Sequence, residues 1–393
     1  MLKILVLILP LFLLQSCKTS QVSPSSESKG ASGHQVDRTG VWLTNVGSKV
    51  LYSKASIDAA ASYSQKLGIN SLYPVVWNKQ EVFLESETVK KYLGASFISS
   101  PEGMDVLKEV VESARSRNMT TYAWYENGLK VPVKTEAGEY FELGRVLKNK
   151  GWLTTTQSGA YTGKCEFGVC KGFLNPFKPE VRKFLLEFAE EICRNYDVEG
   201  FMVDDHFSMD PSFGYDKFTL DRYYDYIAKK GLKDTQTEFD NFRSSEIVTL
   251  LNDIKNAARK HGKKFILSPG GDPEWSKKSW LLDWEKVVWL KAADEIIMQS
   301  YRYDMLSFQF LINGWKLGNL AKTLPFSTAI LTGLKNNTKT TGKLIYEQTK
   351  AALDKGYGVS YFYYDTFETP ASGLETKEDR DYWLEQTANL LKR

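Results

Sequence analysis

Short apolar segments alternate with amphipathic stretches along this chain, and the alternation restricts the possible folds more than any other feature. The apolar segments lie at residues 40–46, 71–77, 120–126, 200–205, 264–269, 295–301, 325–331 and 358–364. Helical patterns lie near 56–67, 102–117, 179–195, 240–260, 281–290, 305–321, 343–355 and 376–391. Eight strands that are each followed by a helix predict a (β/α)8 TIM barrel, an α/β fold. A doubly wound open sheet is the alternative, but no glycine-rich dinucleotide turn follows any of these strands.

The chain begins with the pattern of a signal peptide. Residues 1–16 hold one lysine and then an apolar run that is too short to span a membrane. The run ends in Leu-Gln-Ser-Cys, which resembles a bacterial lipobox and predicts that Cys17 is acylated; an ordinary secretory signal is the alternative. Lys18 follows Cys17, at the position where an aspartate would favour retention of the lipoprotein in the inner membrane. We therefore expect an outer-membrane lipoprotein that faces the periplasm, or otherwise a secreted protein.

Composition divides the remaining chain into two parts. Residues 17–38 are rich in Ser, Gly and Lys without any apolar period, so we expect a lipidated N-terminus and flexible tether. Residues 39–393 show no second linker and no internal repeat, which predicts one domain. The net charge is +3 and no basic stripe is visible, which argues against a nucleic-acid partner. We expect a monomer that contacts the membrane through its N-terminal lipid.

The cysteines point to an oxidised loop and not to a metal site. Cys165 and Cys170 lie in the segment GKCEFGVCKG, and in an oxidising compartment we expect them to form a disulfide. Cys193 falls on the expected buried side of a helix and should stay reduced. The sequence has 3 histidines, and none stands at a ligand spacing from the cysteines. We predict neither a metal nor a cofactor.

In a barrel of this kind the carboxyl ends of the strands converge on one face, where TIM-barrel enzymes carry their active sites. Two long connections, 127–178 and 206–216, follow strands on this face and are expected to build the walls of a cleft. The polar and aromatic residues at these strand ends are Asn45, Trp77, Asn78, Glu126, Asn127, Asp204, Asp205, His206, Ser268, Gln299, Tyr301, Arg302, Tyr364 and Asp365.

Three carboxylates on neighbouring strands suit the hydrolysis of a glycosidic bond. That reaction needs a proton donor and usually a second carboxylate, and Glu126 with Asp204 and Asp205 could supply both. Close carboxylates raise one pKa by repulsion, which keeps an acid protonated near neutral pH. His206 could orient or balance the set. The alternative is a structural role, in which Asp204 caps the loop or pairs with Arg302.

Several other strand-end residues are candidates for substrate binding. The sequence is rich in aromatic residues, with 10 Trp, 21 Tyr and 21 Phe, and flat rings stack on sugars. We expect platforms at Trp77, Trp124 and Tyr301, with packing inside the barrel as the alternative for each. Arg302 could bind a carboxylate such as the lactyl group of muramic acid. Asp365 and His206 complete the expected substrate-binding set.

These residues resemble the family 10-like bacterial glycosyl hydrolases, the DUF187 or GHL10 group. The similar segments run in order along nearly the whole mature chain: GVWLTNV, YAWYENGLKVP, GFLNPFKPEVRKFLLEFAEEICRNYDVEGFMVDDHFSMDPSFGYD, DEIIMQSYRYD, STAILTGLKN and GVSYFYYDT. The resemblance implies a TIM barrel whose acidic site comprises Glu126, Asp204 and Asp205. The chain departs from the family pattern at Glu199, where an aspartate is usual, and in its pair of loop cysteines.

Relatives in this family act on bacterial envelope glycans, so the resemblance implies an O-glycosyl hydrolase. We expect lysozyme-like cleavage of β-1,4 bonds in peptidoglycan strands, including peptide-free or deacetylated strands. The alternatives are a hydrolase of another amino-sugar polysaccharide and a non-catalytic glycan-binding lipoprotein. Two routes are open. Adjacent aspartates could position the N-acetyl group of the substrate as nucleophile, or Glu126 could supply a second carboxylate, which we favour.

Overall fold

The computed structural model describes residues 38–334 and 339–392. The expected signal peptide, Cys17 and the tether up to residue 37 lie outside the described residues. Arg38, which composition placed at the end of the tether, forms an ion pair with Glu295. In the described part of the chain, no helix is long and apolar enough to cross a bilayer.

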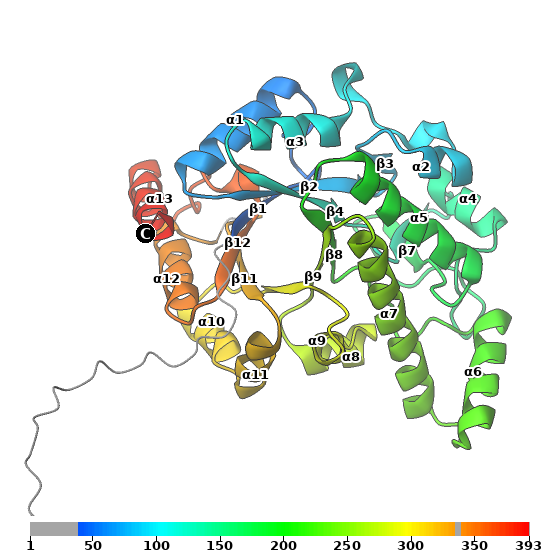
Figure 1. Ribbon diagram of the computed structural model, residues 1–393. Coiled ribbons are helices and arrows are strands. Elements are labelled where there is room, and N and C mark those ends of the chain that lie inside the picture. Colours follow the sequence, from blue (N-terminus) through cyan, green and yellow to red (C-terminus); the bar gives the residue numbers. More distant parts are fainter. Residues whose placement is uncertain (1–37, 335–338, 393) are drawn as a thin grey trace, which may run out of the picture. The chain divides into compact units, whose positions relative to one another are not determined.

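Eight parallel strands close into a barrel with helices around it (Figure 1). β1 pairs with both β2 and β12, so the sheet has no open edge between them. The predicted TIM barrel is confirmed, and the open doubly wound sheet is excluded. The barrel strands are β1 (Thr39–Leu43), β2 (Ser71–Asn78), β4 (Thr120–Tyr125), β8 (Gly200–Asp204), β9 (Lys264–Ser268), β10 (Glu295–Gln299), β11 (Phe326–Leu331) and β12 (Gly358–Phe362).

The helices other than α8 (Pro273–Trp280), which was not predicted, follow the predicted amphipathic stretches because each buries one apolar face against the barrel. The pattern near 305–321 is broken into two helices at Gly314, a residue of low helix propensity. Pro179 begins α5, where a fixed φ suits the first helical turn. The helices are α1 (Lys54–Lys66), α3 (Val106–Arg115), α5 (Pro179–Asn195), α7 (Gln236–Arg259), α8 (Pro273–Trp280), α9 (Trp284–Trp289), α10 (Met305–Ile312), α11 (Trp315–Thr323), α12 (Gly342–Leu353) and α13 (Lys377–Leu391).

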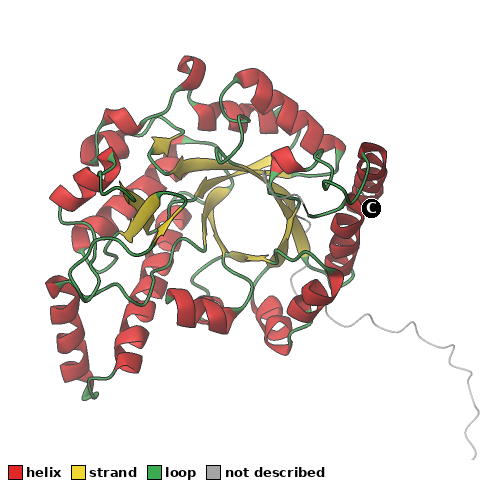
Figure 2. Cartoon of the chain, turned by 180° about the vertical axis from the view of Figure 1, so that it is seen from behind, coloured by secondary structure: helices red, strands yellow, loops and turns green. Residues whose placement is uncertain are grey.

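The connections at the carboxyl ends of the strands hold more regular structure than the sequence indicated. The segment after β4 forms a small antiparallel sheet in the order β5-β7-β6, visible beside the barrel strands in Figure 2. β5 buries only Val131, Pro132 and Val133, a run too short to stand out in the sequence, and its proline argued against a strand. The additional elements are β3 (Glu81–Val82), α2 (Glu87–Tyr92), β5 (Lys130–Thr135), α4 (Glu142–Asn149), β6 (Cys165–Glu166), β7 (Val169–Phe173), α6 (Lys217–Lys230) and the 3-10 turns Ala95–Phe97, Pro101–Gly103 and Tyr364–Thr366.

Aromatic side chains on the barrel strands pack edge to face. The ring of Trp42 lies 5.0 Å from that of Tyr73 and 6.4 Å from that of Trp124, measured between centroids. Trp124 also meets Phe362 at 6.3 Å. These rings support the carboxyl ends of the strands, because Trp124 reaches from this cluster to a carboxylate at the end of β8.

Candidate active site

Asp204 is the last residue of β8, and its side chain is held on both oxygens. Oδ2 accepts a hydrogen bond of 3.0 Å from Trp124 Nε1, and Oδ1 accepts one of 2.9 Å from the backbone N–H of His206. Asp204 is only 4% exposed. Burial, followed by the nearby Asp205 and Glu126, raises the pKa of Asp204 well above its usual value. Trp124 therefore positions a carboxylate, and at 2% exposure it is not an open platform for a sugar.

Asp205 lies one residue beyond the strand and is oriented by a neutral amide. Its Oδ1 accepts a hydrogen bond of 2.7 Å from Gln299 Nε2 at the end of β10. The same nitrogen donates to the carbonyl of Ser268 at 3.0 Å, which fixes the side chain of Gln299. The sequence pointed to Gln299 only through its strand-end position, because an amide carries no charge signal.

Glu126 follows β4 directly and combines burial with an unsatisfied oxygen. Its Oε2 has no hydrogen-bond partner among the described residues. Burial raises the pKa of Glu126 to about 8; Asp205 adds to this rise, and the cations Lys79 and Lys171 oppose it. Glu126 is therefore mostly protonated at neutral pH, which is the state that a general acid requires.

His206 connects the two acidic strand ends. Its Nδ1 lies 2.9 Å from the backbone carbonyl of Glu126, and a carbonyl only accepts, so Nδ1 carries the hydrogen. Burial lowers the pKa of His206, which favours the neutral ring with Nε2 as an acceptor. The backbone of Gly128 passes so close that an added Cβ would lie 2.4 Å from the His206 carbonyl carbon. This close approach, with a φ of +56°, requires glycine.

The remaining predicted binding residues divide into two groups. Tyr301 belongs to the acidic site: burial and then Asp205 and Asp204 raise its pKa, and its ring packs on Phe362 at 5.5 Å. Arg302 donates to the carbonyl of Tyr301 at 2.9 Å and forms no ion pair with a described carboxylate. Of the two structural alternatives for Asp204, the ion pair with Arg302 is therefore absent from the described chain, whereas the loop cap is present, because Asp204 Oδ1 accepts the backbone N–H of His206.

Trp77 packs outside the barrel, away from these contacts. Trp77 is 1% exposed, and its ring lies 5.4 Å from that of Tyr125 and 5.7 Å from that of Phe184 on α5. Trp77 is therefore not the expected sugar platform, because its side chain points outward from β2 into the layer between strand and helix. Asp365 lies in the 3-10 turn Tyr364–Thr366 that follows β12.

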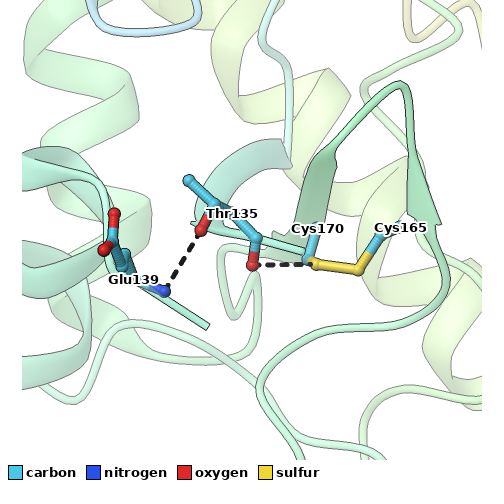
Figure 3. The surroundings of a disulfide bond; sticks show 4 residues. All are labelled: Thr135, Glu139, Cys165 and Cys170. Carbon is cyan, nitrogen blue, oxygen red and sulfur yellow. Dashed lines mark hydrogen bonds between the residues drawn. A yellow bond between two sulfur atoms is a disulfide. The ribbon is translucent and has the colours of Figure 1, made fainter. Parts of the chain in front are cut away.

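A pocket of about 560 Å³ adjoins Glu126 and His206. One wall is the end of the barrel, and the opposite wall is the small sheet β5-β7-β6. A disulfide joins Cys165 and Cys170 across the β6-β7 hairpin, and Cys170 Sγ lies 3.4 Å from the Thr135 carbonyl oxygen (Figure 3). Cys193 is a buried free thiol. The described side chains contain no cluster of three or more potential metal ligands.

Comparison with known proteins identifies the family. Residues 38–348 match the family described as glycosyl hydrolase-like 10. The chain is 23% identical to glycosyl hydrolase YngK of Bacillus subtilis over 65% of its own length and 44% of the relative. It is also 23% identical to glycosyl hydrolase DigH of Escherichia coli over 68% of its length and 64% of the relative. The chain thus spans about half to two thirds of these relatives.

Solved structures resemble this barrel at low sequence identity, so they bear on the fold alone. The glycoside hydrolase domain of PgaB from Bordetella bronchiseptica superposes with a TM-score of 0.60 at 12% identity, covering 83% of this chain and 93% of that domain. An α-L-fucosidase from Paenibacillus thiaminolyticus has a TM-score of 0.59 at 12% identity, covering 90% of this chain and 49% of the fucosidase. The family match over most of the chain is the stronger finding: the chain belongs to the glycosyl hydrolase-like 10 family.

Proposed function

We propose that this protein is a glycoside hydrolase that cleaves β-1,4 bonds within peptidoglycan glycan strands. One observation carries the proposal: Glu126, whose pKa is raised to about 8, lines a pocket and feels the charge of Asp205. A protonated carboxyl group beside a second carboxylate is the minimal apparatus of most glycosidases. Family membership supports the reaction class.

We assign a different task to each carboxylate. Glu126 donates its proton to the leaving glycosidic oxygen, because it is the protonated group that faces the pocket. Asp205 is the second carboxylate, held by Gln299 in an orientation that stabilises the developing positive charge at the anomeric carbon. Asp204, with both oxygens engaged by Trp124 and the backbone N–H of His206, fixes the turn at the end of β8 from which Asp205 projects.

The choice of peptidoglycan rests on where the chain is expected to be. A signal sequence followed by a lipobox would place the domain on a short tether in the cell envelope, within reach of an immobile polymer. This anchoring has its own test. Cys17→Ala should move the protein from the membrane fraction to the soluble periplasm, and an unchanged membrane fraction would exclude acylation at Cys17.

The substrate is tested by mass spectrometry of products from intact, peptide-free and deacetylated sacculi. We expect new reducing ends within the glycan backbone, and cleavage of deacetylated strands would support the route in which the protein supplies both carboxylates. Strict dependence on the N-acetyl group, together with an active Glu126→Gln variant, would instead establish the substrate-assisted route. Binding without products from any sacculus, or cleavage confined to a glucosamine polymer, would overturn the proposal.

A further inference from the structure

The pocket beside Glu126 is lined by three lysines from three different elements. Lys79 lies between β2 and β3, Lys130 begins β5, and Lys171 lies in the middle of β7. None of the three ammonium groups lies within 4.0 Å of a carboxylate in the described chain. Three lysines without an ion-pair partner in the described chain therefore give this pocket a positive charge.

Because all three lysines line the same pocket, the positive charges of Lys130 and Lys79 act on Lys171. Burial lowers the pKa of Lys171, and the positive charges of Lys130 and Lys79 add to this effect. The positive charge of Lys130 is partly compensated by the ring of Trp280, because Lys130 Nζ lies over this ring, 4.6 Å from its centroid. Glu166 is the other acidic residue of the pocket besides Glu126, and Glu126 is mostly neutral at pH 7. The pocket therefore keeps a net positive charge.

The rest of the pocket wall is apolar. Phe141, Phe167 and Val169 contribute to it, and Phe167 is fully exposed at the tip of the β6-β7 hairpin. Phe167 has a φ of +52° and is followed by Gly168 at +77°. Two consecutive left-handed residues form the tight turn that is usually made by Asn-Gly. A bulky aromatic residue is costly at this position, and the disulfide between Cys165 and Cys170 holds the hairpin closed.

We propose that this pocket binds a sugar that carries a carboxylate group, with Lys79 and Lys171 contacting the carboxylate and Phe167 contacting the apolar face of the ring. The inference rests on the proposed function, because it places the charged sugar beside the bond that Glu126 protonates. A lactyl ether on an amino sugar and the C6 carboxylate of a uronic acid share this chemistry. In peptidoglycan the lactyl group of muramic acid presents this carboxylate wherever it carries no stem peptide.

Direct binding tests the inference independently of cleavage. Isothermal titration with the wild-type protein would compare three oligosaccharides of equal length and β-1,4 linkage. The first alternates N-acetylglucosamine with N-acetylmuramic acid, the second is the same compound with its carboxylates converted to methylamides, and the third is a chitin oligomer. We expect the carboxylated compound to bind about tenfold or more tightly than its amide, the scale of a charge-assisted hydrogen bond. A β-1,4-linked uronate oligomer, as a fourth ligand, distinguishes the two carboxylate sources.

Two variants and a matched control locate the effect. Lys171→Gln and Lys79→Gln should each reduce the ratio of the two affinities, whereas Lys171→Arg should largely retain it. Lys164→Gln is the control, since Lys164 is exposed beside Cys165 but does not line the pocket. Equal affinity of wild type for the acid and the amide would overturn this inference, whether or not sacculi are cleaved. Discrimination between acid and amide without cleavage of any sacculus would leave this inference standing and overturn the proposed function.

Discussion

Two glutamates at opposite ends of the barrel, each with a buried carboxylate oxygen, show how differently one fold treats the same side chain. Glu295 opens β10 at the amino end and is 2% exposed, and its carboxylate is fully engaged. It pairs with Arg38 at 2.5 Å and accepts a hydrogen bond of 3.0 Å from Ser327. Glu126 follows β4 at the carboxyl end, and its Oε2 has no partner among the described residues.

The comparison teaches that burial alone does not mark a catalytic group. A buried carboxylate with a fixed guanidinium partner is part of the structure, whereas an unpaired one is available for proton transfer. Cavity size would have misled, because the pocket of about 770 Å³ at the amino end, lined by Arg38 and Glu295, is larger than the one beside Glu126. The presence or absence of a cationic partner for the glutamate distinguishes the two ends of the barrel, whereas the volume of the pocket does not.

The largest expected effect is on kcat and comes from substitution of Glu126 or Asp205, the proposed catalytic residues. Glu126→Gln should retain the fold by circular dichroism but lower kcat by about 10²–10⁴-fold, the scale of acid-base catalysis. Asp205→Asn should lose a similar factor, since it removes the second carboxylate. Measurement of reducing ends released from sacculi checks both variants. Near-normal rates in both would show that the chemistry lies elsewhere.

Substitution of Glu295, the glutamate that is paired with Arg38, should lower the free energy of unfolding. Glu295→Gln leaves the Arg38 guanidinium buried without its counter-charge, which costs about 3–5 kcal/mol of the free energy of unfolding. Denaturant titration measures the loss. The matched variant Glu126→Gln leaves no cation unpaired at an ion-pair distance and should cost far less. Equal losses in the two variants would contradict the distinction between a paired and an unpaired glutamate.

The raised pKa of Glu126 predicts two pH dependences. If Glu126 is the acid, kcat should fall about tenfold per pH unit above about 8. Because the folded-state pKa lies above the ordinary value of 4.5, the folded state binds the extra proton. The stability that Glu126 contributes is therefore present below pH 4.5 and is lost as pH rises through about 8.

A variant can sharpen this pH prediction. Lys171 lowers the pKa of Glu126, so Lys171→Gln should move the alkaline limb of kcat to higher pH. Lys164→Gln should leave the limb in place. A limb that does not move with Lys171, or that persists in the residual activity of Glu126→Gln, would assign it to another group.

The smallest expected effect concerns the hairpin tip. Phe167→Asn replaces a bulky residue by one that tolerates φ near +52°, so the protein should gain about 0.5–1 kcal/mol of stability. The same change removes an exposed ring from the pocket wall and should weaken glycan binding by a few-fold. Thermal unfolding and titration with the oligosaccharides measure the two effects. A gain in stability without a loss of affinity would mean that the ring does not contact substrate.

The sequence predicted the barrel well because each strand is buried on both faces and stands out as an apolar run. It also placed Glu126, Asp204 and Asp205 correctly at strand ends, which topology brings together. It could not distinguish Trp77 from Trp124, because the direction of a side chain depends on the register of its strand. Gln299 was indicated only by its strand-end position, and the three pocket lysines carried no local signal, since their roles arise only when distant segments meet.

The small sheet has a consequence for how such enzymes diversify. It is built from one continuous insertion between β4 and α5, and two of the three pocket lysines, Lys130 and Lys171, belong to it. Glu126, Asp204 and Asp205, the proposed catalytic residues, belong instead to the ends of the barrel strands. Exchange of residues 130–173 between homologues would thus transplant substrate preference while the catalytic apparatus stays intact. Selection can act on the insertion as a separate module, and so can a protein engineer.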